Sequence, residues 1–378
     1  MLRIMILMIF MINIGLTSCI ASEEPIITAK SAIVMDAATG KVLYAKDAEA
    51  KRYPASTTKM MTLIVALENG NLDDVIEASE KASKTEGSSL WLEHGEKLTL
   101  RDLLYGVMLV SGNDATVAVA EHIAGSVDAY AKLMTKKAHE IGAVHTSFTN
   151  SSGLPDPNHY STAHDLAMIA AYGYKNPLFE EFVSTKSKII PWAMNDFGRE
   201  LFNENRMLWL YEGGNGVKTG YTDAAGRCLV SGAKREGVQL VAVVLDSEFM
   251  WNDSIALLDY SFKQIKAVKL YNAESVVKNV LVDSGVKSTV DIAVKEDVVI
   301  PMVEEDKQNF VTVVDIPERI NAGFAKGDKL GTLRVMYHDK EVAATDLIAT
   351  HSVEKKSFFQ AVYKSLTNIV NLFVTKFF

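Results

Sequence analysis

Strand-like segments lie at both ends of a long stretch of the chain whose middle is helical, and this order constrains the fold more than any other feature. Residues 31–36 and 41–46 predict two strands joined by a turn at 37–40, which together form a hairpin. Further strand-like runs come much later, at 215–220, 228–233 and 239–245. Strands from such distant parts of the chain are expected to share one sheet that the intervening helices cover. The pattern predicts an α/β fold, a sandwich of sheet and helices with a helical lobe.

The residues between those strands carry apolar side chains at helical spacing. One predicted helix has its apolar positions at Met60, Leu63, Ile64 and Leu67. A second has them at Leu100, Leu103, Leu104, Val107 and Met108. From Ala115 to about Ile141 small apolar residues dominate, which indicates closely packed helices.

Beyond about Lys269 the pattern changes to short runs rich in valine and isoleucine, separated by turn residues. These runs are 276–282, 289–294, 310–314 and 332–337. We expect a small all-β domain over 270–350, after a first domain over 26–265. The length of 378 residues fits two domains, and 48% apolar with 23% charged residues excludes a disordered chain or a disulfide-stapled mini-protein. The net charge of −8 gives no support to nucleic-acid binding.

The N-terminus has the pattern of a secretory signal peptide. Arg3 precedes a largely apolar run over residues 4–16, which is too short to span a bilayer comfortably. Small residues follow, and cleavage after Ala21 would remove residues 1–21 from an exported protein. Two alternatives stay open. Residues 16–19 resemble a lipobox in which Cys19 would be lipidated, and the run could be retained as an anchor.

Residues 353–378 predict an amphipathic helix at the C-terminus. From Lys355 onward the chain has four lysines and no acidic residue. A basic helix with aromatic side chains on its other face fits a membrane interface, and we favour this over a last helix packed on its own domain. The apolar stripe consists of Phe358, Phe359, Val362, Leu366, Ile369, Val370, Phe373 and Phe377.

Three short motifs follow one another through the first predicted domain. Ser56 and Lys59 form Ser-x-x-Lys in the first turn of a predicted helix, on one helix face. Residues 111–113 read Ser-Gly-Asn between two helices, and residues 218–220 read Lys-Thr-Gly on a strand. Ser-x-x-Lys alone proves little, because it recurs at Ser231, Ser275, Ser284 and Ser352. The ordered set, however, matches the signature of penicillin-interactive serine acyl transferases.

The chemistry of this set is coherent. A serine hydroxyl is a weak nucleophile until a base takes its proton. A lysine can be that base if burial or a second cation lowers its pKa. Lys59 and Lys218 in one site would disfavour double protonation, as a lysine base at neutral pH requires.

Over nearly its whole length the sequence resembles the low-molecular-mass penicillin-binding proteins that are D-alanyl-D-alanine carboxypeptidases. The resemblance includes residues 111–115, 152–162 and 216–222, the β-rich second domain and the C-terminal anchor. It implies a β-lactamase/penicillin-binding-protein-like fold with an antiparallel sheet, and it implies no metal or other cofactor. The expected partners are peptidoglycan stem pentapeptides as substrate, β-lactams as inhibitors and a membrane surface. The expected location is the periplasmic face of the cytoplasmic membrane.

The resemblance implies three catalytic residues. Ser56 would form the acyl-enzyme, and Lys59 would take its proton. Ser111 would relay a proton to the leaving D-alanine.

The resemblance also implies a substrate-binding group. Asn113 would hold the substrate amide, Lys218 would tune the charge of the site, and Thr219 would bind the terminal carboxylate. Tyr221, which follows Gly220, would supply a backbone N–H to the oxyanion hole together with that of Ser56.

The sequence departs from the family pattern at two places. Tyr221 stands where relatives often have histidine, and Ser152 begins a Ser-Gly-Leu where they often have His-Gly-Leu. We expect these differences to affect substrate preference or deacylation, since neither removes a catalytic group. Either Arg206 or Arg227 is a candidate for binding the carboxylate. Residues 87–89 are a candidate loop at the border of the site.

Other candidate sites have structural interpretations. The histidines at 139, 145, 159 and 164 do not form His-Glu-x-x-His, so a zinc peptidase is not expected. Asp165 fits a capping box with Thr162. Cys228 lies in a predicted apolar strand and is expected in the core. If Cys19 leaves with the signal peptide, no intrachain disulfide can form.

Three functions are weighed. The first is a carboxypeptidase that trims the terminal D-alanine from peptidoglycan pentapeptides. The second is a β-lactamase, but the Glu-x-x-Leu-Asn of class A enzymes is absent and the Tyr-x-Asn of class C is replaced by Ser111-Gly112-Asn113. The third is a non-enzymatic cell-wall protein, which the intact motifs oppose. We therefore expect the carboxypeptidase.

Overall fold

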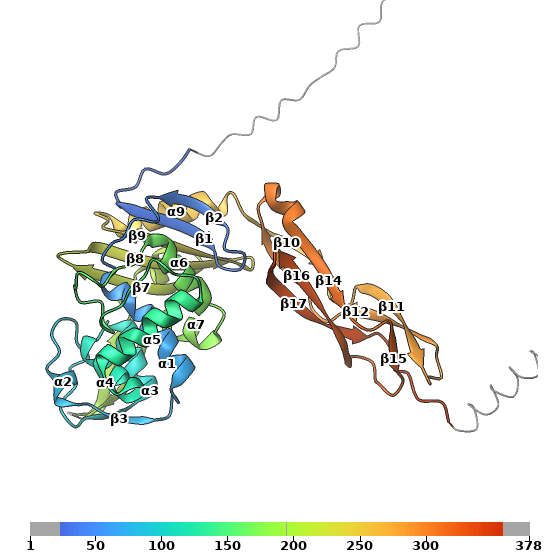
Figure 1. Cartoon of the computed structure of the whole chain (residues 1–378), viewed down its shortest axis with the longest axis horizontal. Helices are drawn as coiled ribbons and strands as arrows, with labels where there is room; N and C mark the ends of the chain where they lie inside the picture. The colour runs from blue at the N-terminus through green and yellow to red at the C-terminus, as the bar shows by residue number, and fades with distance from the viewer. Residues whose placement is uncertain (1–22, 194, 358–378) are drawn as a thin grey trace, which may run out of the picture.

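The computed structural model of the protein describes residues 23–193 and 195–357. Figure 1 shows two bodies, a larger one that combines a sheet with helices and a smaller one built of strands. The expected α/β sandwich followed by an all-β domain is confirmed. The predicted signal peptide and residues 358–378 of the predicted C-terminal helix lie outside the described residues. The prediction is wrong for 353–357, which are not helical, because Val353 and Lys355 form β-bridges with Phe324 and Gly285. Among those that are described, no helix has the length and apolarity needed to cross a membrane.

The larger body is organised around a five-stranded antiparallel sheet in the order β2-β1-β9-β8-β7. β1 (Ser31–Asp36) and β2 (Val42–Lys46) form the expected hairpin. β9 (Val238–Leu245) pairs with β1, so the two ends of this body meet in the middle of the sheet. β8 (Gly226–Arg235) and β7 (Gly214–Thr222) complete it, as the distant strand-like runs predicted.

Helices cover both faces of this sheet, which explains why its central strands β1 and β9 are buried along nearly their whole length. In β9, Val241 and Val243 pack into the core beneath the helical lobe. Leu240 and Ala242 point to the other face and pack in the core that includes α9 (Met250–Phe262). This alternation follows from the two-residue period of a strand.

The lobe is helical, and the three helical stretches predicted around 60–67, around 100–108 and from 115 to about 141 are confirmed. Its helices are α1 (Lys59–Asn69), α2 (Glu80–Ser83), α3 (Leu100–Leu109), α4 (Asn113–Ala124), α5 (Val127–Glu140), α6 (Ala163–Gly173) and α7 (Pro177–Ser184). The short α8 (Met207–Leu210) precedes β7. A strand pair of β3 (Val75–Glu77) and β4 (Lys97–Thr99) leads into α3.

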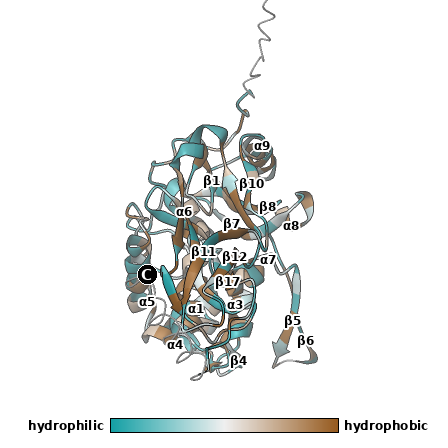
Figure 2. Ribbon diagram, turned by 90° about the vertical axis from the view of Figure 1, so that its right-hand side faces the viewer, coloured by the Kyte–Doolittle hydropathy of each residue, from teal (hydrophilic) through white to brown (hydrophobic). Residues whose placement is uncertain are grey.

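A hairpin of β5 (Ser187–Trp192) and β6 (Asn195–Phe202) was not predicted from the sequence. Figure 2 shows it at the side of the lobe opposite to α5. Arg199 of this hairpin is buried, and its Nη2 lies 3.0 Å from Oε1 of Glu96, which is also buried. This ion pair, together with the buried side chains of Ile190 and Leu201, attaches the hairpin to the lobe.

The smaller body has its own apolar core between two sheets. A six-stranded sheet has the order β14-β16-β17-β12-β11-β15, and β10 pairs with β13 in a second sheet. The sequence predicted β11 (Val276–Asp283), β12 (Thr289–Val294), β14 (Phe310–Asp315) and β16 (Lys329–Tyr337). It did not predict β10 (Lys266–Tyr271), β13 (Val298–Met302), β15 (Arg319–Asn321) or β17 (Lys340–Ala349).

Candidate active site

Ser56 and Lys59 lie side by side at the start of α1. Ser56 does not belong to the first turn of the α-helix, as the sequence had suggested. It lies in a 3₁₀ turn, Ala55–Thr58, that precedes α1. Because a 3₁₀ helix has three residues per turn, positions i and i+3 are superposed. Nζ of Lys59 therefore lies 2.9 Å from Oγ of Ser56.

Lys59 is fully buried and is held by two further acceptors. Nζ donates to Oδ1 of Asn113 at 2.7 Å and to the carbonyl oxygen of Ser152 at 2.8 Å. When the amine is neutral it has two N–H groups and one lone pair. If the two N–H groups occupy these acceptors, the lone pair is directed at the hydroxyl of Ser56. The geometry suits a general base.

The electrostatic surroundings favour the neutral amine. Burial lowers the pKa of Lys59 well below its ordinary range, and the neighbouring Lys218 lowers it further. Glu204 and Asp114 act on the same pKa in the opposite direction. Burial also lowers the pKa of Lys218, to about 8.

The Lys-Thr-Gly motif lies on β7, which runs along the 3₁₀ turn. Lys218 is buried, and its Nζ donates to the carbonyl oxygen of Thr219 at 3.1 Å and to its Oγ1 at 3.3 Å. A Cβ added to Gly220 would lie 2.9 Å from the backbone nitrogen of Ser56, so only glycine permits this approach. The side chain of Tyr221 is 61% exposed, and its hydroxyl donates to Asp223.

Ser111 occupies a strained position between α3 and α4. Its φ of 60° is uncommon for a residue other than glycine. The side chain is buried, and Oγ has no hydrogen-bond partner within residues 23–193 and 195–357. Strain and an unsatisfied buried hydroxyl are both features of functional positions.

Asn113 connects the site to the loop that the sequence had suggested at its border. The backbone N–H of Asn113 donates to the carbonyl of Ser88 at 2.7 Å, and Nδ2 donates to that of Glu86 at 2.8 Å. A Cβ on Gly87 would lie 2.6 Å from Nδ2. The loop therefore fixes the orientation of this amide.

The two candidate arginines lie in different surroundings. The guanidinium of Arg206 lies over the ring of Trp251 on α9, 5.8 Å from its centroid. Arg227 is the cross-strand partner of Tyr221, and its charge acts on the Tyr221 hydroxyl. Arg227 is thus the one that the sheet places next to the Lys-Thr-Gly strand.

Three groups near the site had not been identified from the sequence. The Ser152 carbonyl carries no side-chain signal, since any residue has one. Glu204 accepts a hydrogen bond from the Thr219 hydroxyl at 3.3 Å. His159 is buried beneath the 3₁₀ turn, where Nε2 lies 2.8 Å from Oγ1 of Thr58 and the Thr149 N–H donates to Nδ1. Burial lowers the pKa of His159 to about 4, so the ring is neutral.

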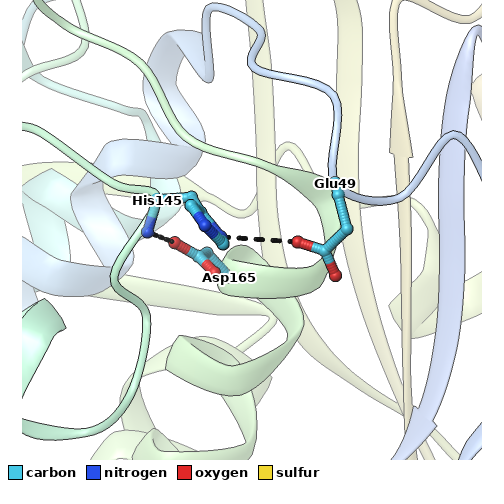
Figure 3. Close-up of side chains that lie close together, drawn as sticks. All are labelled: Glu49, His145 and Asp165. Carbon is cyan, nitrogen blue, oxygen red and sulfur yellow. Dashed lines mark hydrogen bonds and ion pairs between the residues drawn. The ribbon is translucent and has the colours of Figure 1, made fainter.

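A separate cluster brings together Glu49, His145 and Asp165 (Figure 3), with ligand-type atoms within 4.8 Å of one another. One carboxylate oxygen of Asp165 accepts from the His145 N–H at 2.8 Å and from the Thr146 hydroxyl at 2.7 Å. One carboxylate oxygen of Glu49 lies 3.5 Å from Nδ1 of His145, and the other lies 3.2 Å from Nδ1 of His164. Ordinary polar contacts thus account for the cluster.

The capping box at α6 is only half formed. The Asp165 N–H donates to Oγ1 of Thr162 at 3.0 Å, as expected. The Asp165 carboxylate instead binds His145 and Thr146, because these donors are supplied by the loop packed over the helix start.

Cys228 is buried in β8, as expected for a core residue. Burial raises the pKa of its thiol to about 11, which makes it unreactive. The described residues contain no second cysteine.

Comparison with known proteins identifies relatives for both bodies. Residues 18–248 match the family described as D-alanyl-D-alanine carboxypeptidase, and residues 266–355 match the penicillin-binding protein 5 C-terminal domain. The chain is 35% identical to D-alanyl-D-alanine carboxypeptidase DacF of Bacillus subtilis, over 88% of this chain and 87% of that protein. It is 30% identical to DacC of Escherichia coli, over 90% and 88%.

A solved structure of penicillin binding protein 5 from Haemophilus influenzae superposes with a TM-score of 0.62 at 30% identity. The alignment covers 88% of this chain and 99% of that one. A Streptococcus pneumoniae PBP3 structure, described as a peptidoglycan synthesis regulatory factor, superposes with a TM-score of 0.70 at 26% identity. It covers 87% of this chain and all of that one.

Proposed function

The chain belongs to the D-alanyl-D-alanine carboxypeptidase family, and we propose that it removes the terminal D-alanine of peptidoglycan stem pentapeptides through an acyl-enzyme on Ser56. It is a serine-type carboxypeptidase of the penicillin-binding protein 5 kind. The observation that carries the mechanism is the 2.9 Å contact between Ser56 and the buried amine of Lys59.

Acylation begins when Oγ of Ser56 attacks the carbonyl carbon of the penultimate D-alanine and Lys59 takes the hydroxyl proton. The tetrahedral oxygen accepts from the backbone N–H groups of Ser56 and Tyr221, a type of interaction worth about 10²–10³ in rate per donor. The C–N bond then breaks, and a proton reaches the leaving amine through Ser111. This serine is suited to relay because its hydroxyl has no partner among the described residues. Water hydrolyses the ester, which restores Ser56.

The substrate ends in a carboxylate, and Lys218 with Thr219 forms the subsite for it. The Thr219 hydroxyl and the Lys218 ammonium lie 3.3 Å apart on β7. Arg227, on the neighbouring strand, adds positive charge. Asn113, held by the 86–88 backbone, orients the substrate amide.

β-Lactams are proposed as inhibitors that acylate Ser56. A strained lactam carbonyl meets the same nucleophile, base and oxyanion donors as the peptide. Its carboxylate fits the same Lys218–Thr219 subsite.

The proposed location is the periplasmic face of the cytoplasmic membrane, and the proposed role is in cell-wall maturation and cell shape. Support comes from the predicted signal peptide, residues 1–21, and from the basic amphipathic pattern of residues 353–378. The domain limits 26–265 and 270–350 are likewise proposals.

The direct test is D-alanine release from a synthetic pentapeptide. We expect stoichiometric D-alanine and tetrapeptide from the wild type and none from Ser56→Ala. Cys228→Ser serves as a folded control with unchanged activity. Equal release by wild type and Ser56→Ala would refute the acyl-enzyme.

A further inference from the structure

Glu204 places a carboxylate against the hydroxyl that the substrate carboxylate needs. Oε2 of Glu204 lies 3.3 Å from Oγ1 of Thr219, which donates to it. Nζ of Lys218 donates to the same Oγ1 from 3.3 Å. A threonine hydroxyl has a single proton. In the free enzyme that proton is directed to Glu204, and Lys218 occupies a lone pair.

The surrounding structure fixes the backbone that carries Glu204. Its N–H donates to the carbonyl of Leu109 at 3.1 Å. The asparagines on both sides are buried: Oδ1 of Asn203 accepts from the Asn205 N–H, and Oδ1 of Asn205 accepts from the Met207 N–H. Glu204 itself is exposed, so its side chain can swing aside while its Cα stays in place.

The charge of Glu204 also reaches the base. It raises the pKa values of Lys59 and Lys218, against the lowering caused by their burial. The carboxylate therefore lies within electrostatic range of both cations of the site.

We propose that Glu204 is a specificity-determining residue that occupies the carboxylate subsite in the free enzyme and competes with the substrate carboxylate for the Thr219 proton. This inference rests on the proposed function. Substrate binding requires Glu204 to release Thr219, and two carboxylates then repel each other across the subsite. The enzyme thereby discriminates against leaving groups that carry a second negative charge. It also binds the terminal carboxylate of the substrate more weakly than it would if Lys218 were present without Glu204.

The test compares two thioesters of N-acetyl-D-alanine, one with mercaptoacetate and one with its neutral carboxamide as leaving group. Both are activated, so both acylate Ser56, and only the first presents a carboxylate. In Glu204→Gln we expect kcat/KM for the anionic thioester to rise about two- to fivefold, mainly through KM, since exposed charge pairs are worth up to about fivefold. For the neutral thioester, kcat/KM should change by less than about 1.5-fold, which is small beside the effect of an exposed charge pair.

Salt and a matched variant sharpen the test. Because Glu204 is exposed, the gain should shrink toward unity when the ionic strength rises from about 0.02 to about 0.5 M. Glu200→Gln removes the same charge from an exposed position on β6 and should leave both thioesters unchanged.

Equal changes for the two thioesters would overturn the proposal, since Glu204 would then act only through the lysines. No change for either would also overturn it. A β-lactam adduct on Ser56, measured on every variant, separates these outcomes from failure of the proposed function, which would abolish the adduct in the wild type.

Discussion

Replacing His159 by glutamine should remove much of the acid sensitivity of the larger body. Glutamine can keep the hydrogen bond to Thr58, on which the 3₁₀ turn of Ser56 rests, but it cannot titrate. The pKa of His159 falls from an ordinary 6.5 to about 4, mainly because burial penalises the charged ring; the charge of Lys59 adds to this and Asp156 opposes it.

The sign and size of this change in stability follow from the linkage between protonation and folding. The native ring stays neutral between pH 6.5 and about 4, whereas the unfolded chain takes up a proton in that window. Stability is therefore fully present above the unfolded pKa and is lost as the pH falls toward 4. At pH 4.5 the loss comes to about 2 to 3 kcal/mol, since each pKa unit is worth about 1.4 kcal/mol.

Urea unfolding followed by tryptophan fluorescence measures this loss. All four tryptophans, at 91, 192, 209 and 251, belong to the larger body, so the signal reports on it alone. Between pH 7 and 4.5 the wild type should lose about 2 to 3 kcal/mol more unfolding free energy than His159→Gln. The exposed His145→Gln should follow the wild type. Identical pH dependence in wild type and His159→Gln would refute the reasoning.

Three further predictions follow from the same geometry. kcat/KM for peptide hydrolysis should rise with pH as Lys59 loses its proton. It should fall above about pH 8 as Lys218 loses the charge that binds the substrate carboxylate. A kcat/KM that stays constant from about pH 7 to 10 would contradict these roles of the two lysines. Gly220→Ala should lower kcat/KM by about 100-fold and leave the circular dichroism spectrum unchanged, because the added Cβ displaces the backbone of Ser56. A kcat/KM within about threefold of the wild-type value would show that the close contact between β7 and Ser56 is not needed. A chain ending at Ser357 should no longer sediment with anionic vesicles that retain the full-length protein, and co-sedimentation of both would exclude the tail as anchor.

The motifs could be predicted from the sequence because they are local. Ser56 and Lys59 are three residues apart, and either a 3₁₀ or an α turn brings them together. Residues 111–113 and 218–220 carried a recognisable order, although their meeting depends on the whole sheet. Strands β1 and β9, at the two ends of the larger body, could be predicted because burial on both faces makes them largely apolar.

What the sequence could not indicate depends on backbone and long-range contacts. The carbonyl of Ser152 binds Lys59 through an atom that every residue has. Glu204 lies 15 residues before Thr219 in the chain and meets it only through the path between β6 and β7. The β5–β6 hairpin is largely exposed, and only Ile190 and Leu201 pack into the core beside the Arg199–Glu96 ion pair, which is too short an apolar pattern to predict two strands.

The central claim is that Ser56, activated by Lys59, is the acylated nucleophile, and mass spectrometry tests it most directly. After incubation with saturating benzylpenicillin, the intact wild type should gain the mass of one ring-opened drug. Peptide mapping should place that mass on the peptide containing Ser56, and Ser56→Ala should gain none. An unmodified wild type, or an adduct on any other residue, would contradict the account.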